Sequence, residues 1–505
     1  MFLYPLTRRS PCGGCATPAA ARRARGVRGD DEGPRFGAQR LRVAASGLRH
    51  RLWPCSSPAH VPMGTPRGAF RFNLPAPPQL GWWAVVVLCL VTTTGFYTDL
   101  LRLVNPIGEK YVPSFPPGQN DFSYAYYGAL ALIARQNPYH NNRPELTNPI
   151  FRIAAVIDHV EFKQLYPPGH LLTFVPLALW KGAQWEEAAR VWSRLNLLFL
   201  LGLATLTLAI VRRVMSLPMT PLWIVLLFGA LALNPGTELG LERGQSDILI
   251  ALLCWTAVLC FLRGAIGSAI FLAIWATSIK GYPILFAAGL IGLAVAHRRW
   301  RQALVGVAVA GVLLVLPVWR YFADAAKGTR MRAEMFQAVW FNHGFRNVVY
   351  RWSPAWADRG RTALTAFALA VTAAAWVQML RAVKQGSEAA SAFWLALFAT
   401  VSLGTVLGYS ALSVSYNLIL ILPGTLVLAA SQDRVSGALL SLPRWGSHAL
   451  GALLLGCLFL LFICRLGDDP PGYQGNIPGA AYGLALLYPT LAALLARGLS
   501  RPLEG

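Results

Sequence analysis

The sequence predicts an all-helical, polytopic integral membrane protein with about twelve transmembrane helices, and two observations support this fold class. First, the 505 residues are 55% hydrophobic and only 13% charged, whereas a soluble domain carries about a quarter charged residues. Second, apolar stretches of roughly 20 residues, enough to cross about 30 Å of hydrocarbon, recur from Trp82 to the C-terminus. The predicted spans are approximately 82–100, 192–211, 219–236, 246–262, 264–279, 282–297, 302–319, 363–381, 391–409, 412–430, 446–465 and 478–496.

The first 75 residues differ in composition from the rest of the chain. Up to Leu80 there are 13 Arg, no Lys and three acidic residues, a net charge of +10 (13 − 3), with almost no apolar periodicity. Such a composition cannot bury enough apolar surface to fold, so residues 1–75 are expected to form a disordered basic arm ahead of a membrane domain at 76–500. An organellar presequence, or a start at Met63, fits the same residues.

The positions of the basic residues predict how the spans are oriented. The formal net charge is +23, but the cations are scattered among loops and do not gather on one face as nucleic-acid binding requires. If the arm is cytoplasmic, the even-numbered spans end beside cations, which is the distribution of the positive-inside rule. Both termini are therefore expected in the cytoplasm of a multi-pass plasma-membrane protein. The cationic ends are Arg212–Arg213, Arg263, His297–Arg299, Arg381 with Lys384, and Arg497.

Two external segments are too long to be simple connections, running from about Leu101 to Arg190 and from about Arg320 to Arg361. Long loops often carry function, and hardly any ionisable residue lies near the middle of a predicted span. The chemistry is therefore expected at the external membrane surface. An apolar run of about 14 residues, ending at Trp180, follows a proline pair in the first loop. We interpret it as an interfacial or re-entrant helix, because a thirteenth span would reverse every later loop.

The first loop also contains the segment NDFSYAYYGALALI at 120–133. Helical spacing puts Phe122, Tyr126 and Leu130 on one face, which is typical of a helix that lies on the membrane with its aromatic rings among the headgroups. Asp121 begins this helix. It either caps the helix or acts as a general base for a hydroxyl nucleophile.

Three cations, Arg243, Lys280 and Arg346, are predicted on the same membrane side as Asp121. Each alone fits a loop cation that extends towards water, whereas together they suit a phosphate leaving group beside a hydroxyl nucleophile. Gln245 and Asp247, with Tyr126, are candidates to contact sugar hydroxyls.

The eight cysteines predict no metal or redox centre. Five of them lie in apolar runs, where free cysteine behaves as a small hydrophobe. Cys12 and Cys15 form a C-x-x-C pair without a second pair or a histidine partner. We therefore expect no cofactor and no obligatory metal.

Several segments, in their order along the chain, resemble the GT-C class of membrane glycosyltransferases, and within it glycosyltransferase family 87. They are DFSYAYYGALALI with NPY, YPPGHLLTFVPLAL, GQSDILIALL, SIKGYPILF with HRRWRQAL, and SVSYNLILILP. The resemblance extends from about Trp82 to Ala430. It implies a polyprenyl-phosphate-mannose donor, an active site outside the cytoplasm and an acidic base in the first external loop. Asp121 matches that acid, and Asp99, at the external end of the first span, is the alternative base.

The sequence thus predicts a hexosyltransferase that moves a hexose, with mannose favoured, from a polyprenyl-phosphate carrier to a lipid or glycan acceptor hydroxyl. A transporter or flippase of lipid or polysaccharide is the main alternative, because it also needs many spans and basic cavities. The lack of midplane charges argues against it. A non-catalytic member of the transferase class is a third interpretation.

Overall fold

The structure is a computed structural model that describes residues 121–139, 166–182, 184–215, 227–229, 231–232, 235–327, 344–410 and 415–431, with short pieces at 452–453, 456–457, 487–492 and 495. The predicted arm at 1–75, the predicted span at 82–100 and Asp99 lie outside the described residues. Most of the predicted spans at 219–236, 446–465 and 478–496 also lie outside them. The count of twelve spans and the large first external loop therefore stay predictions.

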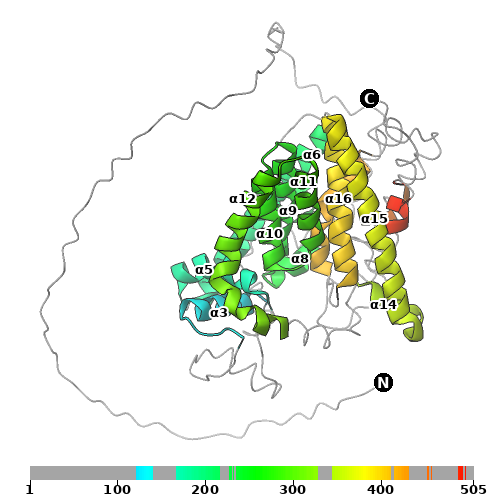
Figure 1. The fold of residues 1–505 in the computed structure, drawn as a ribbon. Coiled ribbons are helices and arrows are strands. Elements are labelled where there is room, and N and C mark those ends of the chain that lie inside the picture. The colour runs from blue at the N-terminus through cyan, green and yellow to red at the C-terminus, as the bar shows by residue number, and fades with distance from the viewer. Residues whose placement is uncertain are drawn as a thin grey trace, which may run out of the picture. The chain divides into compact units, whose positions relative to one another are not determined.

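The described residues form helices and contain no strand, which confirms the all-helical prediction for this part of the chain (Figure 1). The helices are α3 (Asp121–Ile133), α5 (Pro168–Lys181), α6 (Trp185–Met215), α8 (Pro235–Glu242), α9 (Asp247–Leu262), α10 (Ile266–Ile279), α11 (Ile284–Ala296), α12 (Trp300–Ala310), η2 (Gly311–Val315), η3 (Leu316–Tyr321), α14 (Phe345–Trp352), η4 (Pro354–Trp356), α15 (Ala357–Gln385), α16 (Glu388–Tyr409), η5 (Ser415–Leu420) and α17 (Leu422–Ala430).

Four helical segments among the described residues are long and apolar enough to cross a membrane: Glu187–Val214, Trp300–Lys327, Pro354–Gln385 and Glu388–Tyr409. Each contains one of the predicted spans. The shorter apolar helices α9, α10 and α11 coincide with three further predicted spans. The structure therefore supports a membrane protein with several apolar helices at the expected positions.

The long helices differ in how much protein surrounds them. In α16, 94% of the most apolar window is buried, so this helix forms the centre of the bundle. In Trp300–Lys327 only 28% of that window is buried, and many large apolar side chains are exposed. A helix of a membrane protein that is apolar and exposed is expected to face lipid. This helix also changes its winding, since the π-helix η2 and the 3₁₀-helix η3 follow α12.

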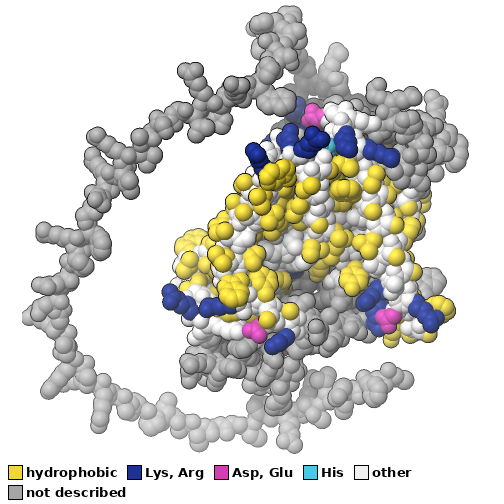
Figure 2. All heavy atoms as spheres, viewed as in Figure 1, with side chains coloured by type: hydrophobic (Ala, Val, Ile, Leu, Met, Phe, Trp, Pro, Cys, Tyr) yellow, Lys and Arg dark blue, Asp and Glu magenta, His cyan; other side chains and the backbone are white. Residues whose placement is uncertain are grey.

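Some of the predicted cationic helix ends lie beside other helix ends of the bundle. Arg213, at the end of α6, forms an ion pair with Glu388, at the start of α16, with 3.1 Å between Nη1 and Oε1. The turn at Gly264, between α9 and α10, lies close to Arg299. A Cβ atom added at Gly264 would be 3.7 Å from Nη1 of Arg299. Figure 2 shows a wide hydrophobic band with Lys and Arg gathered at both of its ends. The contacts thus join the end of α6 to the start of α16, and the turn after α9 to the turn before α12.

Helices α3 and α5 pack against each other and lie across the other end of the bundle (Figure 1). The 14 residues of α5 cover about 21 Å at 1.5 Å per residue, too little to cross the hydrocarbon. The sequence predicts that the aromatic face of α3 lies among lipid headgroups, and this prediction is wrong. Phe122 and Tyr126 are buried in the protein, and the ring of Phe122 contacts Phe174 of α5 and Trp192 of α6.

Candidate functional site

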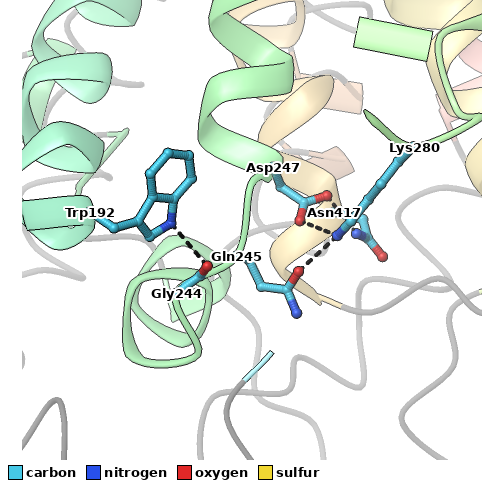
Figure 3. Close-up of polar contacts among 6 residues, drawn as sticks. All are labelled: Trp192, Gly244, Gln245, Asp247, Lys280 and Asn417. Atoms are coloured by element: carbon cyan, nitrogen blue, oxygen red, sulfur yellow. Dashed lines mark hydrogen bonds and ion pairs between the residues drawn. The ribbon is translucent and has the colours of Figure 1, made fainter. Parts of the chain in front are cut away.

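Four buried polar side chains meet where α9 begins and α10 ends (Figure 3). The Nζ atom of Lys280 lies 2.6 Å from Oδ2 of Asp247 and donates a hydrogen bond of 2.8 Å to Oε1 of Gln245. The other carboxylate oxygen of Asp247, Oδ1, accepts a hydrogen bond of 2.7 Å from Nδ2 of Asn417. We call Gln245, Asp247, Lys280 and Asn417 the polar cluster. It unites segments that are up to 170 residues apart in the sequence.

Local backbone structure explains how the polar cluster forms. Gly244 has a φ of +64°, a left-handed conformation that glycine adopts without steric cost, and this lets the chain turn sharply between α8 and α9. The turn is closed by a hydrogen bond of 2.8 Å from the N–H of Gln245 to the carbonyl of Gly240. Asp247 is then the first residue of α9, where a carboxylate also interacts favourably with the positive end of the helix dipole. Lys280 is the extended C-cap residue of α10.

The charges within the polar cluster compensate each other. Asp247 is 1% and Lys280 is 6% exposed, so either charge alone would lose most of its hydration. The ion pair and the amide of Gln245 replace that hydration for Lys280. Because a carboxylate only accepts hydrogen bonds, Asn417 must direct its NH₂ group at Asp247. Both oxygens of Asp247 therefore have a donor.

The start of α3 lies beside the turn that leads into the polar cluster. The backbone N–H of Phe122 donates a hydrogen bond of 3.2 Å to the carbonyl of Arg243. Nε1 of Trp192, on α6, donates a hydrogen bond of 3.0 Å to the carbonyl of the next residue, Gly244. Asp121 is the residue before Phe122, so its backbone is one residue away from this contact. The side-chain position of Asp121 lies outside what the structure describes.

The other predicted site residues are placed differently. Arg346, on α14, directs Nε at Oδ1 of Asp358 at 2.9 Å, and α14 packs mainly against α15. Arg346 is thus paired with a carboxylate outside the polar cluster. The hydroxyl of Tyr126 donates a hydrogen bond of 2.7 Å to the carbonyl of Gly182, after the end of α5, and burial is the main reason that its pKa rises to about 12.

Three residues of the site were not singled out from the sequence. Asn417 lies in the quoted segment SVSYNLILILP, where one amide among apolar residues was the available signal. Tyr166 places its ring 5.9 Å from Nζ of Lys280, and the ring of His170 lies 4.3 Å from that of Tyr166. Both belong to YPPGH, which holds α5 against α10: a Cβ at Gly169 would come within 2.5 Å of the carbonyl oxygen of Ser278.

Among the described residues, no group of three or more His, Cys, Asp or Glu side chains is arranged to hold a metal ion. The donors of the polar cluster are one carboxylate, two carboxamides and an ammonium group, and the ammonium occupies the position between the oxygens that a cation would take. The chemistry of this cluster is therefore that of hydrogen bonding and charge compensation.

Apolar helices of membrane-crossing length define the class: a helical membrane protein, in which the polar cluster is buried where α9 begins and α10 ends. The model of glycosyltransferase family 87 matches residues 165–407, which is consistent with a GT-C class membrane glycosyltransferase and indicates glycosyltransferase activity. The match includes α5 to α16, and with them Gln245, Asp247 and Lys280, whereas Asp121 and Asn417 lie outside it. No curated protein and no solved structure matches the chain.

Proposed function

We propose that the protein transfers a hexose, with mannose favoured, from a polyprenyl-phosphate carrier to the hydroxyl of a lipid or glycan acceptor. The observation that supports this most directly is the backbone hydrogen bond from Phe122 to Arg243. It connects the α3 end that carries Asp121 to the turn that leads into the polar cluster. The backbone beside Asp121 therefore adjoins the turn that carries Arg243 and leads to Gln245 and Asp247, which supports a shared site for these residues.

In the proposed reaction the acceptor oxygen attacks C1 of the sugar while the bond from C1 to the phosphate oxygen breaks. The electron pair of that bond leaves with the polyprenyl phosphate, and the Asp121 carboxylate takes the acceptor proton. Attack on the face opposite the phosphate inverts the configuration at C1. This step needs no oxidant or reductant, because one C–O bond replaces another.

The phosphate is assigned to Arg243 and Lys280, with sugar hydroxyls assigned to Gln245 and Asp247. Lys280 already shares its charge with Asp247, so the pair presents a fixed arrangement of donors and acceptors more than a free positive charge. Arg243 is the second cation assigned to the phosphate. Arg346 would have to leave Asp358 to take part.

The site is proposed to face the extracytoplasmic side. The polar cluster lies at the opposite end of the bundle from the cationic helix ends at Arg212–Arg213, Arg263 and Arg299. The positive-inside rule puts those cations in the cytoplasm. Reporter fusions after Arg213, Arg263, Arg299 and Ser436 should therefore report cytoplasm, and fusions near Asn141 and Gly344 the outside. A reversal between Arg190 and Arg213 would show that α5 spans the membrane.

The decisive experiment is a transfer assay with the full chain reconstituted in lipid nanodiscs. Radiolabelled polyprenyl-phosphate mannose and polyprenyl-phosphate glucose are compared as donors, with membrane lipid extract as acceptor. We expect a labelled product from the mannose donor, and about 10²–10⁴-fold slower transfer by Asp121→Asn, since Asn still caps a helix but cannot accept the proton.

The matched control is Asp99→Asn, which should keep most of the activity. If Asp99→Asn is inactive and Asp121→Asn is not, the base is Asp99. If both variants and the wild type transfer no sugar but move labelled lipid across the bilayer, the protein is a flippase and the proposal is wrong.

A further inference from the structure

Two arginines from distant parts of the chain lie at one corner of the bundle, where α3 ends and η3 ends. Nη2 of Arg320 donates a hydrogen bond of 2.6 Å to the hydroxyl of Tyr321, and that hydroxyl lies 3.4 Å from the carbonyl of Gln136, the residue after Arg135. Both arginines are exposed. We call Arg135, Arg320 and Tyr321 the arginine corner.

Neither arginine has a carboxylate within ion-pair distance among the described residues. The nearest acid along the chain, Asp324, accepts a hydrogen bond of 2.9 Å from Nδ2 of Asn137 and lies 3.9 Å from Nζ of Lys327. Arg320 instead stacks on the ring of Tyr321, with 4.7 Å between its guanidinium carbon and the ring centre. The corner therefore has two positive charges that an anionic group can approach.

The backbone of Arg135 ends helix α3. Its φ is +58°, a left-handed conformation that glycine adopts without strain, and the N–H of Gln136 donates a hydrogen bond of 2.8 Å to the carbonyl of Ala131. This is a common way for a helix to end, and it places Gln136 beside the hydroxyl of Tyr321.

The corner adjoins a surface that fits a hydrocarbon chain. Large apolar side chains of η2 and η3 are exposed next to Arg320, among them Leu313, Leu316 and Trp319, the last of which is 67% exposed. They belong to Trp300–Lys327, the helical segment with the least buried apolar window of the four candidate spans. An apolar strip that ends in guanidinium groups with no carboxylate partner among the described residues matches a lipid with a phosphate headgroup.

A row of tyrosines separates the arginine corner from the polar cluster. The rings of Tyr321 and Tyr139 lie 6.4 Å apart, and the hydroxyl of Tyr139 donates a hydrogen bond of 2.7 Å to the carbonyl of Tyr166. Tyr166 in turn lies beside Lys280, at 5.9 Å. The corner is thus continuous, through three aromatic side chains, with the groups assigned to the sugar and its phosphate.

We infer that the arginine corner binds the phosphate of a polyprenyl monophosphate lipid, with the isoprenoid chain along η2 and η3, as the lipid approaches the polar cluster from the membrane. This inference rests on the proposed function, because the lipid is the donor of that reaction. The corner contributes to capture of the donor and takes no part in the bond-breaking step.

The test measures donor kinetics for two variants that remove the charges in different ways. Arg320→Gln and Arg135→Gly should each raise the KM for the polyprenyl-phosphate sugar about five- to tenfold, the loss expected for one charge-assisted hydrogen bond. The kcat should stay unchanged. Arg135→Gly also relieves the left-handed strain, so its thermal stability should not fall, which separates lost binding from lost folding. Arg320→Lys should restore most of the affinity.

The matched control is Arg359→Gln, because Arg359 is exposed and lies 5.2 Å from the ring of Trp356 without belonging to the corner. It should leave KM unchanged. Wild-type values of KM in both corner variants would overturn the inference. A second outcome would also overturn it: phosphatidylglycerol competes with the donor as well as polyprenyl phosphate does, and this competition is lost in Arg320→Gln. The corner would then bind bulk anionic phospholipid.

If the wild type transfers no sugar, the proposed function fails by itself. The inference is then tested by native mass spectrometry, which measures how much polyprenyl phosphate the intact protein retains. Retention that is weaker in Arg320→Gln but not in Arg359→Gln supports the inference. Equal retention in the wild type and both variants contradicts it.

Discussion

Lys280 and Asp247 form a buried ion pair, with 2.6 Å between Nζ and Oδ2. The sequence suggested separate tasks for these residues, a phosphate for the lysine and a sugar for the aspartate. The structure shows that the two residues neutralise each other. Removing the charge of one of them alone leaves the other charge buried without this partner.

This pairing predicts a strong coupling between the two residues. Lys280→Met should lower the free energy of unfolding by about 3–5 kcal/mol, because it leaves the Asp247 carboxylate buried and unpaired. The double variant Lys280→Met with Asp247→Asn should be more stable than the single one, since no charge remains and the carboxamide introduced at position 247 can still accept from Asn417. Thermal unfolding in detergent measures both. A double variant that loses the sum of the two single effects would show that the residues do not interact.

Helix α5 should tolerate no side chain at Gly169. A Cβ atom there would lie 2.5 Å from the backbone oxygen of Ser278 and 2.6 Å from its Cβ, so Gly169→Ala must move α5 away from the end of α10. We expect a loss of about 1–3 kcal/mol from overpacking, and slower sugar transfer because His170 moves with the helix. Gly281→Ala is the control, since nothing lies within 4 Å of its added Cβ. Equal stability and activity of the two variants would contradict the close contact.

Tyr126 is expected to stabilise the fold and not to bind the sugar. Its phenol pKa is raised to about 12, mainly by burial, so it stays protonated at any physiological pH and keeps donating to the carbonyl of Gly182. Tyr126→Phe removes this bond and should cost about 0.5–1.5 kcal/mol of stability. The KM for the donor should not change, and the pH profile of transfer should keep its shape. A raised KM without lost stability would instead assign the hydroxyl to the sugar.

His297, between α11 and α12 at the cationic end, should make stability depend on pH. Partial burial and the neighbouring charges of Lys384 and Arg299 lower its pKa in the folded protein. The unfolded chain, with a pKa of about 6.5, binds this proton more readily. The contribution is therefore fully present above about pH 6.5 and is lost as the pH falls below it. The fall in Tm between pH 7 and pH 5.5 should be smaller in His297→Gln, and an identical fall would refute the assignment.

The sequence predicted the helices well and the site only in part. Apolar runs of fixed length locate α6, α9 to α12, α15 and α16, because each helix satisfies its own backbone hydrogen bonds within one segment. The sequence also predicted that Gln245, Asp247 and Lys280 lie at the same end of the bundle, because successive spans run in opposite directions. The link from Asp247 to Asn417 did not follow, since it depends on how segments 170 residues apart pack together. The burial of the α3 aromatics was missed for the same reason, because periodicity identifies a face but not what covers it.

The spacing of the polar cluster along the chain sets the order in which it can assemble during synthesis. Asp247 and Lys280 are 33 positions apart, on two adjacent helices, so the ion pair is available as soon as this hairpin enters the bilayer. Asn417 is made 170 residues after Asp247, a delay of about 10–30 s at the usual rates of translation. During that interval Oδ1 of Asp247 lacks the hydrogen bond from Asn417. In the newly synthesised hairpin, water or the translocation machinery must solvate this oxygen.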